Sequence, residues 1–463
     1  MTLTPQVSYI EPSPLADRWT DIFRRDTLVH LGIMGSIVVG TFQGYLKDRI
    51  PGMIPYALAE LFFVAAFVIW FGTLAIRHLP VRGPGIVPGT VLIAILVPTL
   101  FLLHPGAPLV LKVAGLRAWA EFPIACFMAL SIIQSRGQAR AYVGLILVLC
   151  VICAVYGIVQ YRGGPDIALS SELARIRHGT TVFYRAAAGH AEFRAFSTFT
   201  YPAPFAAMMV FGTLLAAGIA VSTVRSTAAR LLSAILIPLF FLGMTISGTR
   251  AALIVLLLGV MIIGWYHGFN IRQLLLVPVG LVALYGATTL TAGTIVARWQ
   301  SVLLDEGVLW KYVYAPITIA GRALGDEPFG LGLGRSGVGV PYTIMRSYPP
   351  GYIVGSDGDI GRAAVEMGVF GLALVALIVI ALMPYAARAV RYLVGTRAED
   401  IGLGFGALVV ANGITILIGS PLSSTPHATI WWFVLGALLK LPALERSEPP
   451  TEAPPSSLGQ HAG

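Results

Sequence analysis

The sequence predicts an all-α fold: a polytopic integral membrane protein with about twelve transmembrane helices and two long outer (periplasmic) loops. Of its 463 residues only 11% are charged and 56% are hydrophobic, whereas globular chains carry about 25% charged residues. The apolar residues also form long, nearly uninterrupted runs. This composition excludes an ordinary soluble domain and a disordered chain, and the three cysteines, an odd number, do not make a disulfide scaffold.

Twelve apolar runs come close to the roughly 20 residues that a helix needs to cross a bilayer. Each is expected to be helical, because lipid offers no water to unpaired backbone groups. The runs are 28–46, 56–77, 86–104, 119–134, 141–160, 201–222, 231–247, 250–266, 272–292, 364–386, 401–420 and 425–441. Charge flanks the fourth run, where Arg117 and Glu121 stand four residues apart and could pair on one helix face.

The runs make one membrane domain, 28–441, between a cytoplasmic N-terminal segment, 1–27, and a disordered cytoplasmic tail, 442–463. Orientation follows from the short loops, because basic residues in them are retained on the cytoplasmic side. The short inner loops hold Arg77, Arg82, Arg136, Arg140, Arg225, Arg230, Arg272, Arg388, Arg391 and Arg397, and the short outer ones hold Lys47, Arg49 and Arg250. Both termini are therefore expected on the cytoplasmic side.

Two long connections, 161–200 and 293–363, then fall outside. They hold ten of the 27 arginines, together with many aromatic residues and glycines. Loops of this length are usually functional or disordered, and this composition favours a folded outer cap. The net charge of +9 does not indicate a nucleic-acid partner, because the arginines do not form one stripe on a soluble face.

Two arginines stand where outer connections meet apolar runs. Arg194 precedes a proline-containing helix start, and Arg250 ends the four-residue corner Ser247-Gly-Thr-Arg250. A guanidinium at the membrane surface can grip a phosphate with two hydrogen bonds, or it can simply anchor a span. Charged groups at such depth are expensive and usually functional, which favours a site at Arg250.

A glycine-rich segment, Pro328–Val340, lies in the second outer connection and carries Arg335, which could bind an anion. Its glycines allow close backbone approach to a ligand or a helix. It has no G-K-[ST] sequence and no βαβ context, so a nucleotide site is not expected.

The tenth run opens with a cluster of charges that comprises Asp357, Asp359, Arg362 and Glu366. An aspartate at the mouth of an outward cavity could act as general base toward a sugar hydroxyl, whereas the alternative is a helix cap. Arg362 and Glu366 are spaced as an i, i+4 pair that could be purely structural.

Taken in order, these motifs resemble the O-antigen ligase-like and Wzy-type polysaccharide polymerase superfamily of bacterial inner-membrane glycosyltransferases. The resemblance covers roughly residues 115–440. It consists of Arg194 before a proline-containing span, the S-G-[ST]-R corner at Ser247–Arg250, and a P-x-G-x-G-x-G segment at Pro328–Gly334. An A-x-E-x-G-x-x-G helix follows at Ala364–Gly371.

The resemblance implies a multi-pass enzyme of the bacterial inner (cytoplasmic) membrane that polymerises or ligates polysaccharide for the cell envelope, with inversion and without metal or cofactor. The donor would be a glycan on undecaprenyl diphosphate, and the acceptor a glycan or lipid-linked glycan at the outer leaflet. Arg194 and Arg250 would hold the diphosphate, with Arg335 and Arg362 as further candidates. Other polysaccharide assembly proteins are expected partners.

One departure from the family leaves polymerase and ligase both open. Ligases usually have a His-Asn pair nine residues before the helix glutamate, and that count from Glu366 leads to Asp357 followed by Gly358. Asp357 or Asp359 would then be the catalytic base, or the chain would be a polymerase. The alternative class is a membrane transporter or flippase of a lipid-linked or anionic substrate. Against it, the sequence shows few ionisable groups in mid-membrane and no inverted repeat.

Overall fold

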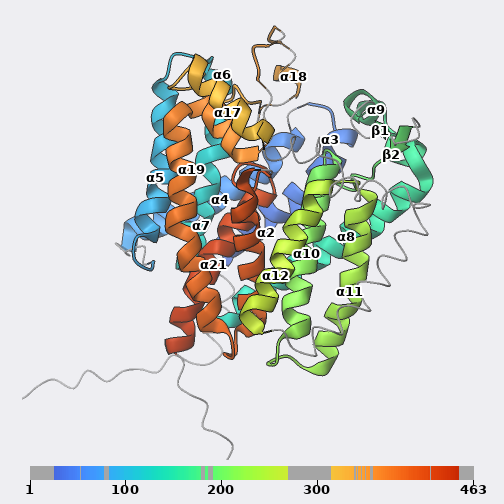
Figure 1. Cartoon of the computed structure of the whole chain (residues 1–463), viewed down its shortest axis with the longest axis vertical. Helices are drawn as coiled ribbons and strands as arrows, with labels where there is room; N and C mark the ends of the chain where they lie inside the picture. Colours follow the sequence, from blue (N-terminus) through green and yellow to red (C-terminus); the bar gives the residue numbers. More distant parts are fainter. Residues whose placement is uncertain are drawn as a thin grey trace, which may run out of the picture.

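The computed structural model describes residues 25–52, 54–77, 83–178, 183–185, 191–268, 314–337, 340, 342–345, 347–349, 351–354, 358–417 and 419–447. Within these ranges the chain is a bundle of long helices with one short β-hairpin (Figure 1). The elements are α2 (Arg25–Thr41), α3 (Gln43–Arg49), α4 (Ile54–Arg77), α5 (Val87–Leu100), η1 (Phe101–Leu103), α6 (Leu109–Leu116), η2 (Arg117–Glu121), α7 (Phe122–Ile132), α8 (Arg136–Ala168), α9 (Glu172–His178), β1 (Phe183–Arg185), β2 (Ala191–Phe193), α10 (Pro202–Val221), α11 (Thr227–Ile246), α12 (Arg250–His267), α17 (Ala315–Asp326), α18 (Tyr342–Met345), α19 (Gly358–Leu393), α20 (Glu399–Ile414), η4 (Thr415–Leu417) and α21 (His427–Ser447).

The helices bear out the prediction of a membrane protein. Eight helical segments are long and apolar enough to cross a bilayer, and the bent pair α2–α3, with 59° between its halves, would make nine. Two further predicted spans correspond to shorter helices, α5 with η1 and α20. The predicted span 272–292 lies outside the described residues. The count of twelve therefore remains a prediction.

Local sequence explains where several helices begin. Ser135 starts α8 with a capping box: its hydroxyl accepts a hydrogen bond from the Gln138 backbone at 3.2 Å, and the Gln138 side chain accepts one from the Ser135 backbone at 3.2 Å. Ser226 caps α11 through the backbone N–H of Ala229. Pro202 stands in the first turn of α10, where its missing N–H removes no helical bond.

Three helices, α10, α20 and α21, are buried on nearly all sides and form the centre of the bundle. A Cβ at Gly218 of α10 would come within 2.6 Å of the Gly404 nitrogen of α20, so these two backbones touch. Close approach through small residues is a general means of packing membrane helices. The two largest fully buried side chains of the described residues, Trp431 and Trp432, come from α21.

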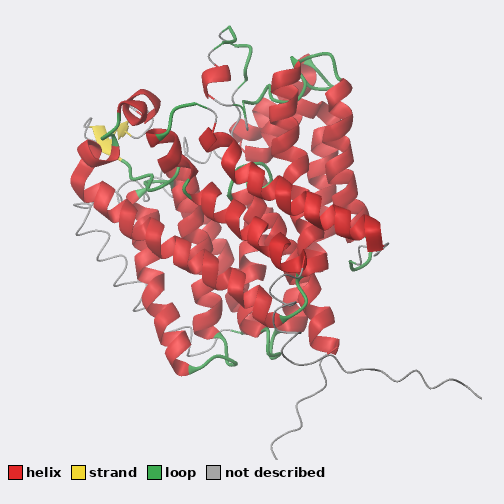
Figure 2. Cartoon of the chain, turned by 180° about the vertical axis from the view of Figure 1, so that it is seen from behind, coloured by secondary structure: helices red, strands yellow, loops and turns green. Residues whose placement is uncertain are grey.

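The helix connections gather at the two ends of the bundle (Figure 2). At one end, Asp400 pairs with Arg140 at 3.2 Å and with Arg225 at 2.6 Å, and Arg136 pairs with Glu445 at 3.2 Å. All three arginines belong to loops predicted to be cytoplasmic, so we call this the inner end. The described parts of both predicted outer connections lie at the opposite end, here called the outer end.

Several helices run past their predicted bounds. α8 continues to Ala168, beyond a break at Gly164 (φ 65°), so part of the predicted outer loop 161–200 is helical. The same loop contains α9 and the antiparallel pair β1–β2, in which Phe183 faces Phe193. α19 starts at Gly358, six residues before the predicted span, and α21 continues to Ser447.

Candidate functional site

A cavity of about 690 Å³ opens at the outer end of the bundle. Its wall comes from α3, η2, the start of α10, the segment after α17, the start of α19 and the loop before α21. Three cationic side chains line it: Lys47, Arg117 and Arg362. No aspartate or glutamate is among the described residues of the lining, so this cavity is suited to an anion.

Arg117 reaches the cavity from η2 and is held from behind by Glu60 of α4, at 2.6 Å between Nη1 and Oε1. Its buried Nε has no hydrogen-bond partner. Arg117 makes this ion pair with Glu60 and not with its predicted partner, Glu121. Arg117 therefore keeps donor capacity beside the cavity, although one carboxylate already faces it.

Arg362 lies at the start of α19 and donates from Nη1 to the Ser423 hydroxyl at 3.1 Å. The neighbouring Asp359, one of the two predicted bases, is fully buried. Its carboxylate accepts hydrogen bonds from the Leu422 backbone at 2.8 Å and from the Ser423 hydroxyl at 2.5 Å. In this structure Asp359 therefore holds the loop before α21 that borders the cavity. Asp357, the other predicted base, lies outside the described residues.

Glu366, one turn beyond Arg362 in α19, is also fully buried and holds a second wall of the cavity. It accepts hydrogen bonds from Trp119 Nε1 at 2.9 Å, from the Ser336 backbone at 3.1 Å and from the Ser336 hydroxyl at 2.5 Å. Ser336 lines the cavity. The predicted i, i+4 ion pair between Arg362 and Glu366 does not form, and Glu366 instead holds the glycine-rich segment through Ser336.

The glycines of that segment serve backbone contact within the described structure. Gly334 (φ 81°) has no room for a Cβ, which would stand 2.2 Å from the Leu111 carbonyl oxygen. Gly368 (φ 58°) breaks α19, and a Cβ there would stand 2.0 Å from the Pro328 carbonyl oxygen. The Val369 backbone donates to that same carbonyl at 2.9 Å. The segment is thus docked on the break in α19, as left-handed glycines permit.

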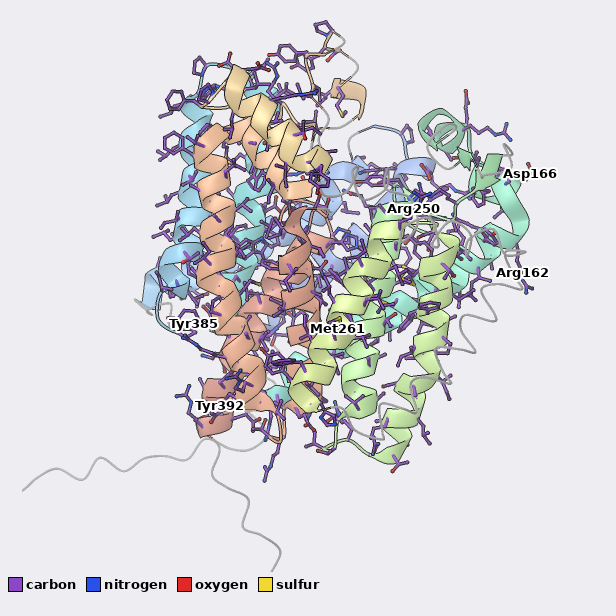
Figure 3. The ribbon with its side chains drawn as sticks, in the orientation of Figure 1. Arg162, Asp166, Arg250, Met261, Tyr385 and Tyr392 are labelled. Atoms are coloured by element: carbon purple, nitrogen blue, oxygen red, sulfur yellow. The ribbon has the colours of Figure 1, made fainter. Side chains whose placement is uncertain are left out.

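The two arginine motifs, Arg194 and the corner Ser247–Arg250, lie side by side in the structure. Arg194 donates from Nε to the Ser247 carbonyl at 2.8 Å and from Nη2 to the Thr249 hydroxyl at 3.0 Å, so its fork holds the corner before α12. Arg250, at the outer tip of α12 (Figure 3), has a buried Nε without a hydrogen-bond partner. Neither arginine is among the residues that line the large cavity.

A smaller cavity of about 220 Å³ adjoins the first and shares Tyr201, Pro204, Arg362 and Ser424 with it. Apolar residues of α10 and α12 form much of its wall, and Thr249 brings the corner held by Arg194 to its edge. Arg362 thus stands where a cationic and a more apolar space meet.

Sequence reasoning placed Arg362 at a site but did not include Lys47 and Arg117. A usable signal was present, because both are charged groups at the ends of apolar runs, where burial is expensive. The fourth predicted diphosphate arginine, Arg335, donates to the Gly106 carbonyl at 3.1 Å and stacks on the Tyr352 ring, and it does not line the cavity.

No cluster of His, Cys, Asp or Glu suited to a metal ion occurs in the described part of the chain. Cys150 and Cys153, spaced as C-x-x-C, are buried within α8, and Cys150 Sγ donates to the Met208 carbonyl at 3.2 Å. Among known proteins, no family model matches the chain and no curated sequence is significantly similar to it.

Proposed function

We propose that the protein is a glycosyltransferase of the bacterial cytoplasmic membrane that transfers glycan from undecaprenyl diphosphate to a glycan or lipid-linked acceptor in the large cavity. Polymerisation and ligation are the two forms of this reaction. The outer end would face the periplasm and both termini the cytoplasm. The observation that carries the proposal is the cavity itself, which combines three cations with no described carboxylate and adjoins an apolar space.

The expected chemistry is displacement at the anomeric carbon. An acceptor hydroxyl forms the new glycosidic bond, the bond to the diphosphate breaks, and the leaving group departs as an anion. Lys47, Arg117 and Arg362 would stabilise the charge that develops on it. Because Asp359 is fully buried and does not line the cavity, Asp357 is the stronger candidate to accept the hydroxyl proton.

Arg250 keeps a role in this proposal. Its buried Nε lacks an acceptor, and Thr249 beside it borders the smaller cavity. Arg250 lines neither cavity, so a diphosphate at their junction would supply that acceptor only once the Arg250 side chain turns toward it. Arg194 would act through Arg250, since it fixes the corner from which Arg250 extends.

The proposal is tested by deleting the gene and separating the lipopolysaccharide and secreted polysaccharide on gels. Lipopolysaccharide capped by a single repeat, or loss of high-mass polymer, indicates a polymerase. Polymer retained on its lipid carrier with bare core indicates a ligase. Complementation with Arg117→Gln or Arg362→Gln should fail to restore the product, because each change removes a charge from the cavity.

Arg162→Gln is the matched control. Arg162 lies in the predicted outer connection 161–200, but it is exposed and points away from the bundle (Figure 3). It should restore the product fully. If all glycans were unchanged in the deletion strain, the proposed glycan-transfer activity would be rejected.

A transporter or flippase is the second candidate, and one observation favours it. Glu60, Arg117 and Glu121 come close together in two helical segments long and apolar enough to span a membrane, and charge at such positions often belongs to a transport pathway. A flippase would leave lipid-linked repeats on the cytoplasmic face of the deletion strain, whereas loss of the proposed enzyme leaves them on the periplasmic face.

A further inference from the structure

Three planar groups stack beside the large cavity. The rings of Tyr348 and Tyr352 lie 5.0 Å apart with 11° between their planes, and the Arg335 guanidinium lies 3.8 Å from the centre of the Tyr352 ring. The order is therefore Arg335, Tyr352, Tyr348. A guanidinium over a tyrosine ring at this distance is an attractive cation–π contact.

The stack is fixed at its arginine end. Arg335 donates from Nη1 to the Gly106 carbonyl at 3.1 Å, and its own carbonyl accepts from the Val354 backbone at 2.8 Å. The Tyr352 backbone donates to the Pro349 carbonyl at 3.1 Å, which closes a turn between the two tyrosines. The hydrogen bonds of Arg335 and the turn that Tyr352 closes restrict the orientation of the rings before any ligand binds.

A small hydrophobic cluster supports the same rings. Ala107, Leu111 and Val340 are buried together, and both tyrosines pack against them. Leu111 belongs to α6, which lies at the same end of the molecule as α17 and α18 (Figure 1). The stack is therefore attached to a transmembrane segment through α6, and it does not depend on the outer connection alone.

Only the last ring of the stack borders the cavity. Tyr348 is part of the lining, whereas Tyr352 and Arg335 are not. One face of Tyr348 is covered by Tyr352, so the surface that it can offer to the cavity is its opposite face and its edge. Lys47 and Arg117 line the same cavity, as does a set of small polar residues: Gln43, Thr200, Ser336, Ser424 and Thr425.

This combination matches the chemistry of a pyranose ring. The C–H face of a sugar is apolar and can lie on an aromatic ring, while the hydroxyls around its edge need hydrogen-bond donors and acceptors. A diphosphate alone would use the cations and leave the ring without a partner. The cavity volume, about 690 Å³, is within the range of ligand sites and leaves room for sugar beside an anionic group.

We propose that Tyr348, held by Tyr352 and Arg335, is the stacking wall of a sugar-binding subsite in the large cavity, and that it binds a neutral pyranose of the glycan. Arg335 is a positioning residue in this arrangement and does not contact the diphosphate. The inference rests on the proposed function for the identity of the glycan, and it adds the place at which sugar is recognised.

The test measures binding of two probes to the purified full-length protein in detergent by isothermal titration. One probe is the oligosaccharide repeat released by mild acid from the host polysaccharide, and the other is geranylgeranyl diphosphate, which has no sugar. Tyr348→Ala should weaken oligosaccharide binding about three- to tenfold, the size expected for loss of one aromatic contact. It should leave geranylgeranyl diphosphate binding within twofold of wild type.

Tyr348→Phe keeps the ring and should bind the oligosaccharide almost as wild type, which separates stacking from a fold defect. Arg335→Lys should weaken oligosaccharide binding less than Tyr348→Ala, because it loosens the stack without removing the wall. Tyr392→Ala is the matched control: Tyr392 also carries a cation–π contact, with Arg446 at 5.6 Å, but at the inner end.

The inference is overturned if Tyr348→Ala binds the oligosaccharide as wild type does, if it loses both probes equally, or if wild type binds only the diphosphate. These outcomes differ from failure of the proposed function. An unchanged glycan profile in the deletion strain would reject the transfer reaction, while oligosaccharide binding would still decide whether the stacking wall exists.

Discussion

Replacing Glu366 by glutamine should lower the stability of the protein and loosen one wall of the cavity. Its two carboxylate oxygens accept from three donors: Trp119 Nε1, the Ser336 backbone and the Ser336 hydroxyl. Glutamine has nearly the same volume but offers one carbonyl oxygen and an NH₂ group that only donates. At least one buried donor then faces another donor.

The magnitude follows from these contacts. A buried donor left without an acceptor costs about 1–3 kcal/mol, and hydrogen bonds to a charged group stand at the upper end, so about 3 kcal/mol is expected. With an unfolding entropy of about 2.1 cal/mol/K per residue over 463 residues, this corresponds to a fall of about 3 °C in the unfolding midpoint.

The assay is thermal unfolding of the purified variant in detergent, followed by tryptophan fluorescence, since Trp119 is one of the partners. Glu327→Gln is the control, because Glu327 lies near the same glycine-rich segment but is exposed. Its midpoint should equal that of wild type. A midpoint for Glu366→Gln that also equals wild type would refute the assignment of Glu366 as the anchor of the Ser336 segment.

Two further predictions concern the two ends of the bundle. Arg194→Lys keeps the charge but cannot make both bonds to Ser247 and Thr249, so we expect a loss of about 1–2 kcal/mol, and a wild-type midpoint in the same thermal assay would contradict the role of Arg194 in holding that corner. At the inner end, burial opposes ionisation of Glu399, but hydrogen bonds from the Thr223 backbone and hydroxyl lower the pKa of Glu399 below its ordinary value. A lowered pKa adds stability above the unfolded-state pKa, and this stability is lost as pH falls from there through the folded-state pKa, which lies below 4.5. The unfolding midpoint of wild type should therefore fall more between about pH 6 and about pH 3 than that of Glu399→Gln, and parallel profiles would contradict this.

The helices and the sorting of their connections were accessible from sequence, because the bilayer imposes a length and a polarity on each span. Arg140 and Arg225, both predicted on the cytoplasmic side, meet at Asp400. The contacts that Arg194 makes were not accessible in the same way. A motif shows that an arginine stands before a span, but its hydrogen bond to Ser247, 53 residues away, depends on how two helices pack.

The predicted pair of Arg117 and Glu121 shows a physical limit of pattern reading. Side chains four residues apart face each other on an α-helix, but residues 117–121 form a π-helical turn, which has more residues per turn. The expected geometry is therefore lost, and Arg117 pairs with Glu60 on a different helix. Lys47 was similarly interpreted as a loop residue. In the structure it belongs to α3, and the bend between α2 and α3 places it in the lining of the cavity.

The beginning of α19 organises the candidate site through one face of one helix. Asp359, Arg362 and Glu366 are spaced i, i+3 and i+7, so they project on the same side. The two carboxylates hold two different walls, at Ser423 and at Ser336, and Arg362 lies between them at the cavity. Any shift of this turn of α19 would therefore move both walls and the cation together. The break at Gly368, on which the glycine-rich segment docks, sets where this turn ends. The glycines and the two acids thus fix the walls of a cavity that Lys47, Arg117 and Arg362 line.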